Sequence, residues 1–379
     1  MANKDIISPA VTDVQTLKEV ISCLEKNTPI KTQGNCGQKT IFEILVKAAS
    51  EKDSIENICK SIENAPSANN VRYHLEKYKS IDTLEIDLNK TLQSKVPEKI
   101  KNCKQKIAID LNLIPYYGKP SEAEKPYIYR SQAKDGTCSF YAYATVYLLK
   151  KNKRFTLALL SVRRDETLVA IVTKLLSLTD LDIKCLYLDR GFCCTPVIRW
   201  LTALDIAFVM PMMFRGRKNS KSQKILSANR SYKTTYQTSS QKYGSIIFSL
   251  WVVCSYANGR HKRRGIERYV FVVYGVKTKL RSIHNHYRKR FGIEASYRMK
   301  NICLIKTTTK NPAIRLLFIA IAFLLVNLWA YILWDRVSSR QKGGRIVYAK
   351  LFPLKRMLAF LRSALEKIYP LIQEVFLPT

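Results

Sequence analysis

The sequence predicts an α/β protein with a mixed β-sheet, preceded by a helical N-terminal domain. Three observations predict this class. Apolar side chains recur at helical spacing through residues 1–100, whereas residues 101–212 read as strand, strand, strand, helix, strand, helix, strand. Residues 316–334 then form an apolar run, which as a buried helix can cover one face of a sheet. This order is typical of an α/β fold that begins with antiparallel strands.

The N-terminal domain contains three predicted helices. The first covers residues 40–49, Asp53 or Ser54 can cap a second, and Ser67 can cap a third. The tight turn before the third helix is compatible with a helix-turn-helix unit. Its last helix would present four polar side chains to DNA: Asn69, Asn70, Arg72 and Lys77. A small helical subdomain without DNA contacts would give the same pattern.

The predicted core begins with a strand at residues 106–115, which alternates between two faces. Ile107 and Ile109 share one face, and Asp110 lies on the other, within the strand and close to its end. Thr195 is the expected N-cap of the second core helix. The other elements follow in chain order: strands at 139–149, 154–162, 183–189 and 206–212, and helices at 166–178 and 195–204. The strands at 139–149 and 154–162 form a hairpin with a four-residue connection.

The second half of the chain adds a polar loop at 213–243, two strands at 244–257 and 268–276 around a basic turn, and a helix that holds Glu294. A C-terminal amphipathic helix follows the apolar run, with one apolar face: Leu354, Met357, Leu358, Leu361 and Leu365. The predicted domains are 1–100 (helical), 101–212 (core, first part), 213–282 (basic β-rich insertion), 283–340 (core, second part) and 341–379 (C-terminal helical region).

Charge is distributed unevenly along the chain. The net charge is +35, yet residues 1–100 carry 14 basic and 14 acidic side chains, so the whole excess lies in residues 101–379. Residues 211–310 hold 23 Lys and Arg but only two carboxylates, Glu267 and Glu294. So large an excess repels itself unless a polyanion offsets it, which indicates nucleic acid or an anionic membrane surface as the partner. The length of the basic region, which includes predicted strands, favours nucleic acid.

Several other classes of protein are poorly supported. The ten cysteines form no CxxC pair, which excludes the usual zinc-site spacing, and the N-terminus does not read as a signal peptide. We therefore expect a reduced, cytoplasmic protein. With four histidines and neither a GxSxG elbow nor a GxxxxGK[ST] loop, serine hydrolase and P-loop chemistry are not indicated.

The apolar run at 316–334 is long enough to span a bilayer. Both of its flanks are basic, so they show no positive-inside asymmetry. A completely buried core helix has the same pattern, and we favour it because the preceding strands need a cover. A membrane protein with one apolar span and a basic cytoplasmic domain remains the alternative, separated by alkaline carbonate extraction.

Three carboxylates could carry chemistry: Asp110 within the first core strand, Asp189 at the end of a later one, and Glu294 on a basic helix. If those two strands are neighbours, the two aspartates lie close together at an edge where α/β sheets place their sites. Close carboxylates repel one another unless divalent cations lie among them, and oxygen ligands suit Mg²⁺ or Mn²⁺. Singly, each has a structural alternative: the aspartates in turns, and Glu294 paired with Arg290 and Arg298 on a surface helix.

Three stretches resemble the catalytic regions of DDE transposases of prokaryotic insertion sequences: AIDLNLIPYYG (108–118), YLDRGF (187–192) and YRKRFGIEASYRMK (287–300). The third resembles the IS-four-type group that carries Tyr, Arg, Glu and Lys around the glutamate, in a branch known from archaea. The resemblance covers about residues 105–335. It implies an RNase H-like catalytic core with an inserted β-rich subdomain. It also implies that Asp110, Asp189 and Glu294 bind two Mg²⁺ ions, for which Mn²⁺ can substitute.

The glutamate motif also suggests phosphate contacts. Tyr287 and Arg290 lie at the family's spacing from Glu294, but Asn301 occupies the place of the family's lysine, and Lys300 comes one residue earlier. A helix turns by about 100° per residue, so Lys300 is rotated off the face of Glu294. Arg298, one turn after the glutamate, is the other candidate.

The resemblance implies a transposase that cleaves double-stranded DNA at the ends of its element and joins the 3′ hydroxyl to target DNA. Arg263 and Arg264 in the basic turn are further candidates for DNA contacts. A homodimer that bridges two DNA ends is expected, with the C-terminal amphipathic helix as a possible aid, and no membrane partner. The alternatives are an RNase H-like nuclease without strand transfer and an inactive DNA-binding relative.

Overall fold

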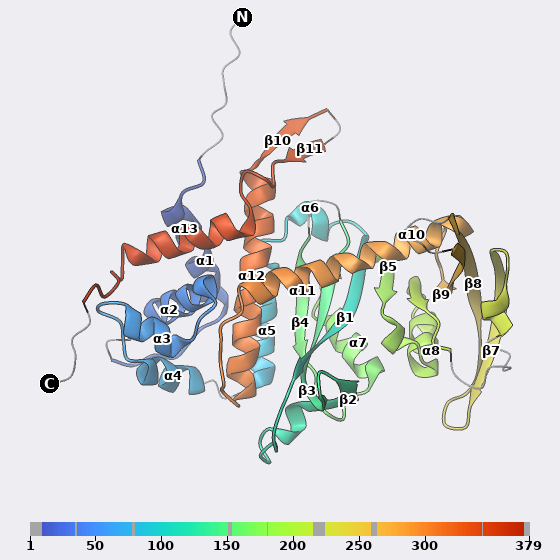
Figure 1. Ribbon diagram of the computed structural model, residues 1–379, viewed down its shortest axis with the longest axis horizontal. Coiled ribbons are helices and arrows are strands. Elements are labelled where there is room, and N and C mark those ends of the chain that lie inside the picture. The colour runs from blue at the N-terminus through green and yellow to red at the C-terminus, as the bar shows by residue number, and fades with distance from the viewer. Residues whose placement is uncertain are drawn as a thin grey trace, which may run out of the picture.

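One sheet of nine strands runs through the protein in the order β2-β3-β1-β5-β6-β9-β8-β7, with β4 paired to β3 (Figure 1). The computed structural model describes residues 10–34, 36–77, 80–150, 154–179, 181–214, 224–258, 264–342 and 344–374. The strands are β1 (Gln105–Pro115), β2 (Ile128–Lys134), β3 (Thr137–Leu148), β4 (Thr156–Ser161), β5 (Ile183–Leu188), β6 (Phe208–Pro211), β7 (Tyr232–Ser240), β8 (Gly244–Asn258) and β9 (Arg264–Tyr274). The sheet is mixed, because β1–β5 and β5–β6 pair in parallel and the other pairs are antiparallel.

All seven strands predicted from the sequence are present, and this sheet contains two further strands that were not predicted. β2 forms a hairpin with β3. β7 lies in the stretch 213–243 that was predicted to be a loop, and that prediction is wrong for Tyr232–Ser240. This strand contains Thr and Tyr, which favour strands, but few aliphatic residues, because it is an edge strand paired only with β8. Residues 151–153, 215–223 and 259–263, which include parts of predicted turns and loops, lie outside the described residues.

The strands of the predicted β-rich insertion continue the core sheet. β9 pairs with β6 in the register Phe208↔Tyr274, and β8 and β7 extend the sheet beyond it. The sheet therefore passes without interruption from the core into residues 213–282.

Helices cover both faces of this sheet (Figure 1). Ile107 and Ile109 of β1 face a core with α7 (Leu168–Ser177) and α8 (Thr195–Ala203), as their alternation predicted. Ala108 faces the other core, together with α10 (Ile283–Arg288) and α11 (Gly292–Ile302). The N-cap of α8 is Cys194, so the predicted N-cap, Thr195, is the first residue of the helix, where Pro196 follows it. Short 3-10 turns occur at Lys125–Tyr127, Arg190–Phe192, Ile225–Ser227, Leu280–Ser282 and Lys289–Phe291.

The apolar run forms α12 (Pro312–Asp335), which lies between the sheet and the N-terminal helices (Figure 1). By length and composition it could cross a membrane, but 89% of its most apolar window is buried inside the protein, as a core helix requires. The N-terminal helices are α1 (Asp13–Asn27), α2 (Gln38–Glu51), α3 (Ile55–Ser61), α4 (Ala68–Glu76), α5 (Ile81–Gln93) and α6 (Glu98–Lys101). The predicted caps Ser54 and Ser67 each accept a hydrogen bond from the backbone of their helix.

The C-terminal helix α13 (Leu354–Glu366) buries its predicted apolar face against α1 and α2. Polar contacts hold it there: Lys367 lies 2.6 Å from Asp13, and the hydroxyl of Tyr369 donates to Glu43 at 2.7 Å. The apolar face is therefore covered by the same chain. If α13 helps a second protomer to bind, its other, exposed face would have to do so.

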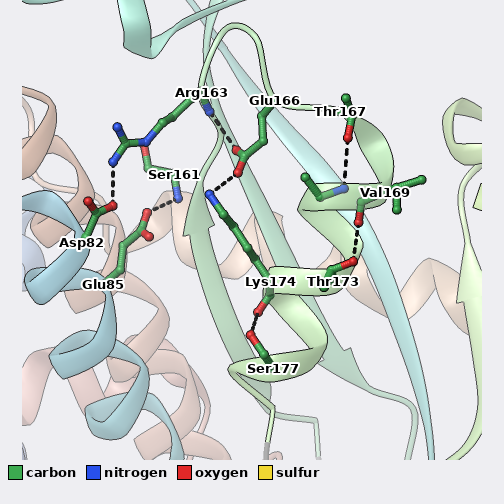
Figure 2. Close-up of polar contacts among 11 residues, drawn as sticks. Asp82, Glu85, Ser161, Arg163, Glu166, Thr167, Val169, Thr173, Lys174 and Ser177 are labelled. Atoms are coloured by element: carbon green, nitrogen blue, oxygen red, sulfur yellow. Dashed lines mark hydrogen bonds and ion pairs between the residues drawn. The ribbon is translucent and has the colours of Figure 1, made fainter. Parts of the chain in front are cut away.

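Side chains of α5 pair with the outer edge of β4 as a neighbouring strand would. Asn89 accepts a hydrogen bond from the Leu159 amide at 2.7 Å and donates to the Leu159 carbonyl at 2.8 Å. One helical turn earlier, Glu85 accepts from the Ser161 amide at 2.7 Å (Figure 2). One turn later, Gln93 donates to a β4 carbonyl at 2.9 Å. An edge strand that would otherwise present unpaired backbone groups is thus sealed by helix side chains.

A two-stranded hairpin, β10 (Ser338–Gln341) and β11 (Gly344–Val347), follows α12 and projects from one end of that helix (Figure 1). It forms a sheet of its own and was not predicted from the sequence. β10 contains no apolar residue and β11 contains only two adjacent ones, Ile346 and Val347, so neither strand shows an alternating pattern that could identify it.

Candidate active site

Asp110 and Asp189 lie side by side on two neighbouring parallel strands. The register pairs Ile109 of β1 with Leu188 of β5, and the next residue on each strand is one of the two aspartates. β5 ends at Leu188, as predicted, but β1 continues to Pro115 through its pairing with β3. The expectation that Asp110 lies near the end of its strand is therefore corrected: Asp110 lies in the middle of β1, where the parallel pairing stops.

Glu294 comes to the same place from α11, which covers this face of the sheet. It lies in the first turn of α11, and Arg290 lies one turn before it in the 3-10 turn that joins α10 to α11. The hydroxyl of Tyr287 donates to the Leu188 carbonyl at 3.2 Å, so α10 is tied to the residue that precedes Asp189. Tyr287 is buried and packs against Phe271 of β9.

The guanidinium of Arg290 lies among all three carboxylates. Its Nη1 is 3.3 Å from Asp110, and its Nη2 is 3.1 Å from Asp189 and 3.7 Å from Glu294. Arg290 is only 5% exposed, and neither its Nε nor its Nη1 has an aligned hydrogen-bond partner in the described part of the chain. The contact with Asp110 is therefore an ion pair with poor hydrogen-bond geometry. Of the two pairings predicted for Glu294 on a surface helix, the one with Arg290 is present, and none with Arg298 is found among the described residues.

The three carboxylates differ in their surroundings. The side chain of Asp110 is 16% exposed, whereas those of Asp189 and Glu294 are 42% and 51% exposed. Burial raises the pKa of Asp110 to about 6, against the opposing attraction of Arg290, and the nearby Asp189 raises it further. One well-buried carboxyl thus lies beneath two that reach solvent, all within range of one cation.

Two hydroxyl groups that sequence reasoning missed lie beside Asp110. Thr145 of β3 is its cross-strand partner, and the hydroxyls of Thr145 and Tyr297 lie 2.7 Å apart. Tyr297 is three residues after Glu294 on α11, so helical spacing could have identified it. The cross-strand position of Thr145 depends on the β1–β3 register, which the sequence alone does not define.

The two candidates for the family's lysine lie in opposite environments. Lys300 is 1% exposed, and its Nζ lies 5.8 Å from the ring centroid of Phe323 of α12. Burial lowers the pKa of Lys300 to about 8. Arg298 is exposed on α11. The structure therefore places Lys300 inside the protein and leaves Arg298 at the surface.

The remaining predicted DNA contacts are dispersed. Asn69 and Asn70 are exposed at the start of α4. Arg72 instead donates to Glu56 of α3 at 2.7 Å, and Lys77 donates to Gln33 at 3.2 Å, so both have partners within the protein. Arg264 is the first residue of β9, and Arg263 lies outside the described residues.

The donors at this site match a hard divalent cation in chemical type. Carboxylates from three separate elements converge on one positive charge, and oxygen ligands are those that Mg²⁺ and Mn²⁺ prefer. Across the described ranges, however, no three Asp, Glu, His or Cys side chains lie close enough together to hold a metal as they stand. The positive charge among the carboxylates is the Arg290 guanidinium.

Comparison with known proteins bears on both the family and the fold. The sequence model of the family described as transposase DDE domain matches residues 101–328, more than half of the chain. No curated protein matches the sequence. The fold is similar to that in a cryo-EM structure of a piggyBac transposase synaptic complex with hairpin DNA, with a TM-score of 0.55 and 11% sequence identity. That similarity covers 96% of this chain and 81% of the other. This chain therefore has an RNase H-like fold.

Proposed function

The chain belongs to the transposase DDE domain family, and from this membership we propose that it mobilises an insertion sequence. It binds the ends of its own element, cleaves the DNA there and joins the 3′ hydroxyl to target DNA. The observation that supports this proposal best is the convergence of Asp110, Asp189 and Glu294, from β1, β5 and α11, on the single guanidinium of Arg290. If Glu294 only formed a salt bridge on a surface helix, two further carboxylates from distant parts of the chain would not be expected beside Arg290.

Asp110, Asp189 and Glu294 would hold two Mg²⁺ ions, with Mn²⁺ as a substitute. When bound, such ions activate the attacking oxygen and stabilise the leaving one in phosphodiester chemistry. Asp110 is the best-buried of the three, and its cross-strand partner Thr145 is hydrogen-bonded to Tyr297. The more exposed Asp189 and Glu294 face the side from which DNA would approach.

Arg290 offsets part of the negative charge of the three carboxylates and is the cation within ion-pair distance of them among the described residues. A divalent ion and a guanidinium compete for the same oxygens, so ion binding requires Arg290 to turn away. A phosphate of bound DNA would receive it, since Arg is suited to phosphate contacts. Tyr287 would act by fixing α10 to β5, because its hydroxyl is already bonded to the Leu188 carbonyl.

Phosphate contacts further along the duplex would come from the exposed Arg298 and not from the buried Lys300. The basic region 213–290 would add salt-sensitive contacts. Two element ends must be cut together, so we propose that the protein acts as a homodimer in the DNA complex. We also propose that it is cytoplasmic and that α12 belongs to its core.

The test uses a DNA fragment that carries this gene with its flanking sequence, together with a target plasmid. Asp189→Asn and Glu294→Ala should abolish Mg²⁺-dependent cleavage and leave binding to the DNA largely intact. Asp182→Asn is a matched control, because Asp182 is an exposed aspartate at the opposite end of β5. Near wild-type cleavage by either active-site variant would show that the assignment is wrong.

The same assay separates transposition from its alternatives. Cleavage without products joined to the target plasmid would indicate an RNase H-like nuclease. Binding without cleavage in either Mg²⁺ or Mn²⁺ would indicate an inactive relative. Short terminal inverted repeats bounded by a direct duplication in the flanking DNA would independently support an insertion sequence.

A further inference from the structure

The hairpin β10–β11 belongs to a stretch of the chain without acidic side chains. Between Asp335 and Glu366 the sequence contains eight basic residues and no Asp or Glu. Two of the eight lie at the end of the hairpin, where Arg340 and Lys342 are both exposed. The described part of the chain contains no carboxylate within ion-pair distance of either, whereas the nearby Arg336 lies 2.8 Å from Glu19. The hairpin therefore carries uncompensated positive charge.

The pairing within the hairpin increases this charge density. Arg340 of β10 lies directly opposite Arg345 of β11. Like charges opposite one another on paired strands are destabilising, and an isolated two-stranded hairpin is only marginally stable. A partner that supplies negative charge would offset the repulsion within this pair.

Arg345 shows how the hairpin is held despite this pair. Its Nη1 donates to the Trp334 carbonyl at 2.8 Å and lies 3.4 Å from the Asp335 carbonyl, both at the C-terminal end of α12. A cation at this end of a helix interacts favourably with the helix dipole. A hydrogen bond of 3.0 Å from the Tyr348 amide to the Val337 carbonyl closes the base of the hairpin. The hairpin is thus fixed to a buried helix and projects from the end of that helix (Figure 1), and its Arg340 and Lys342 are exposed.

We propose that β10–β11 is a DNA-binding arm that contacts the phosphate backbone of the duplex away from the active site. This proposal rests on the proposed function. A two-stranded ribbon fits the major groove of B-DNA, and Arg and Lys at its end reach phosphates on either side. Ser339 and Gln341 add polar groups to the same ribbon. Because its charges are placed for phosphates, the arm binds DNA without regard to sequence.

An anionic membrane surface is the competing partner, since Ile346 and Tyr348 are 44% and 42% exposed close to the same cations. Two features favour DNA. The ribbon projects its charges at its tip, whereas a membrane-surface element usually separates a basic and an apolar face along its length. The only helix that could span a bilayer among the described residues is buried in the core.

The test measures how the affinity for DNA depends on salt. The double variant Arg340→Ala, Lys342→Ala is titrated with a random-sequence duplex of about 30 base pairs by fluorescence anisotropy, between about 50 and 200 mM NaCl. Each lost phosphate contact reduces the slope of log K against log salt by about 0.9, so the expected reduction is about 1.8. The charge-conserving variant Arg340→Lys, Lys342→Arg should retain the wild-type slope.

The matched control is Lys39→Ala, Lys90→Ala, which removes the same charge from α2 and α5, where the two side chains are 66% and 64% exposed. An equal fall in slope for both double variants would mean that only net charge matters, which overturns the arm. An unchanged slope in the hairpin variant would also overturn the arm. The same holds if the hairpin variant loses binding to phosphatidylserine vesicles but does not lose binding to DNA. If the wild type cleaves DNA and the hairpin variant has the wild-type salt dependence of binding, the proposal of a DNA-binding arm is wrong but the proposed function stands. If the wild type does not bind duplex DNA, the proposed function fails.

Discussion

Glu85 is predicted to make the protein less stable as the pH rises through neutrality. This residue of α5 is 8% exposed, and one of its oxygens accepts a hydrogen bond from the Ser161 amide at the edge of β4 (Figure 2). Burial raises the pKa of Glu85 from its ordinary value of 4.5 to about 7, and the nearby Asp82 raises it further. The hydrogen bond from Ser161 and the cations Lys174 and Arg163 oppose this rise but do not cancel it.

The magnitude follows from the difference between the folded and unfolded states. Between pH 4.5 and about 7 the folded state holds a proton on Glu85 that the unfolded state has released, so the free energy of unfolding falls as the pH rises. Each pH unit in this window is equivalent to about 1.4 kcal/mol, and the whole window to about 3 kcal/mol. This contribution is fully present below pH 4.5 and is lost above about pH 7.

Glu85→Gln tests this reasoning, because glutamine keeps an acceptor for the Ser161 amide but does not ionise. Its free energy of unfolding, measured in urea, should exceed that of the wild type at about pH 8 and approach it at about pH 5. Glu122→Gln, at a side chain that is 88% exposed, makes the same charge change and should follow the wild type. A constant difference between Glu85→Gln and the wild type over this range would refute the burial argument.

Three further predictions concern other buried or central groups. Asn327→Leu removes the hydrogen bonds of Asn327 to the Thr156 amide and to the Leu92 and Thr156 carbonyls, so its free energy of unfolding in urea should fall by about 3 kcal/mol or more, with the exposed Asn301→Leu as a control. Lys300→Met should raise the thermal stability at pH 7. The pKa of Lys300 in the folded protein, about 8, lies below the ordinary value of 10.5, so a charged Lys300 destabilises the folded protein at pH 7. Cleavage should stay intact, and loss of cleavage by a folded variant would restore Lys300 as a phosphate contact. Without DNA, Arg290→Gln should bind Mn²⁺ at least about tenfold more tightly than the wild type, as measured by calorimetry. A unit positive charge about 4 Å from a bound ion opposes binding of that ion by up to about 4 kcal/mol. Equal affinities would exclude competition between the guanidinium and the ion.

Periodicity predicted most of the fold because the core strands and helices have strongly apolar faces. The alternation of β1 and the helical spacing of α7 and α13 each identified the side that is buried. Elements with weak patterns were missed. β7 is a polar edge strand, and β10–β11 is mostly polar. No apolar pattern predicts that α5 directs Glu85, Asn89 and Gln93 at a strand edge, because these polar side chains lie beside its apolar stripe.

The candidate site could be predicted in its parts but not in its arrangement. The resemblance identified Asp110, Asp189 and Glu294, and the strand pattern made the proximity of the aspartates plausible. The position of Arg290 among them depends on the turn between α10 and α11, which no local pattern specifies. The burial of Lys300 depends on where α12 packs, about twenty residues further along the chain.

The hydrophobic core of the N-terminal domain has a consequence for how the protein is made. Residues of α1–α5 share one core with α12 and α13, and Asn327 bonds to Leu92 across 235 residues of sequence. A nascent chain emerges with its N-terminus first, so the core of these first helices is complete only once α12 and α13 have been made. The N-terminal helices therefore become ordered together with the two helices that close their core. A translation product that stops before α12 would lack this core.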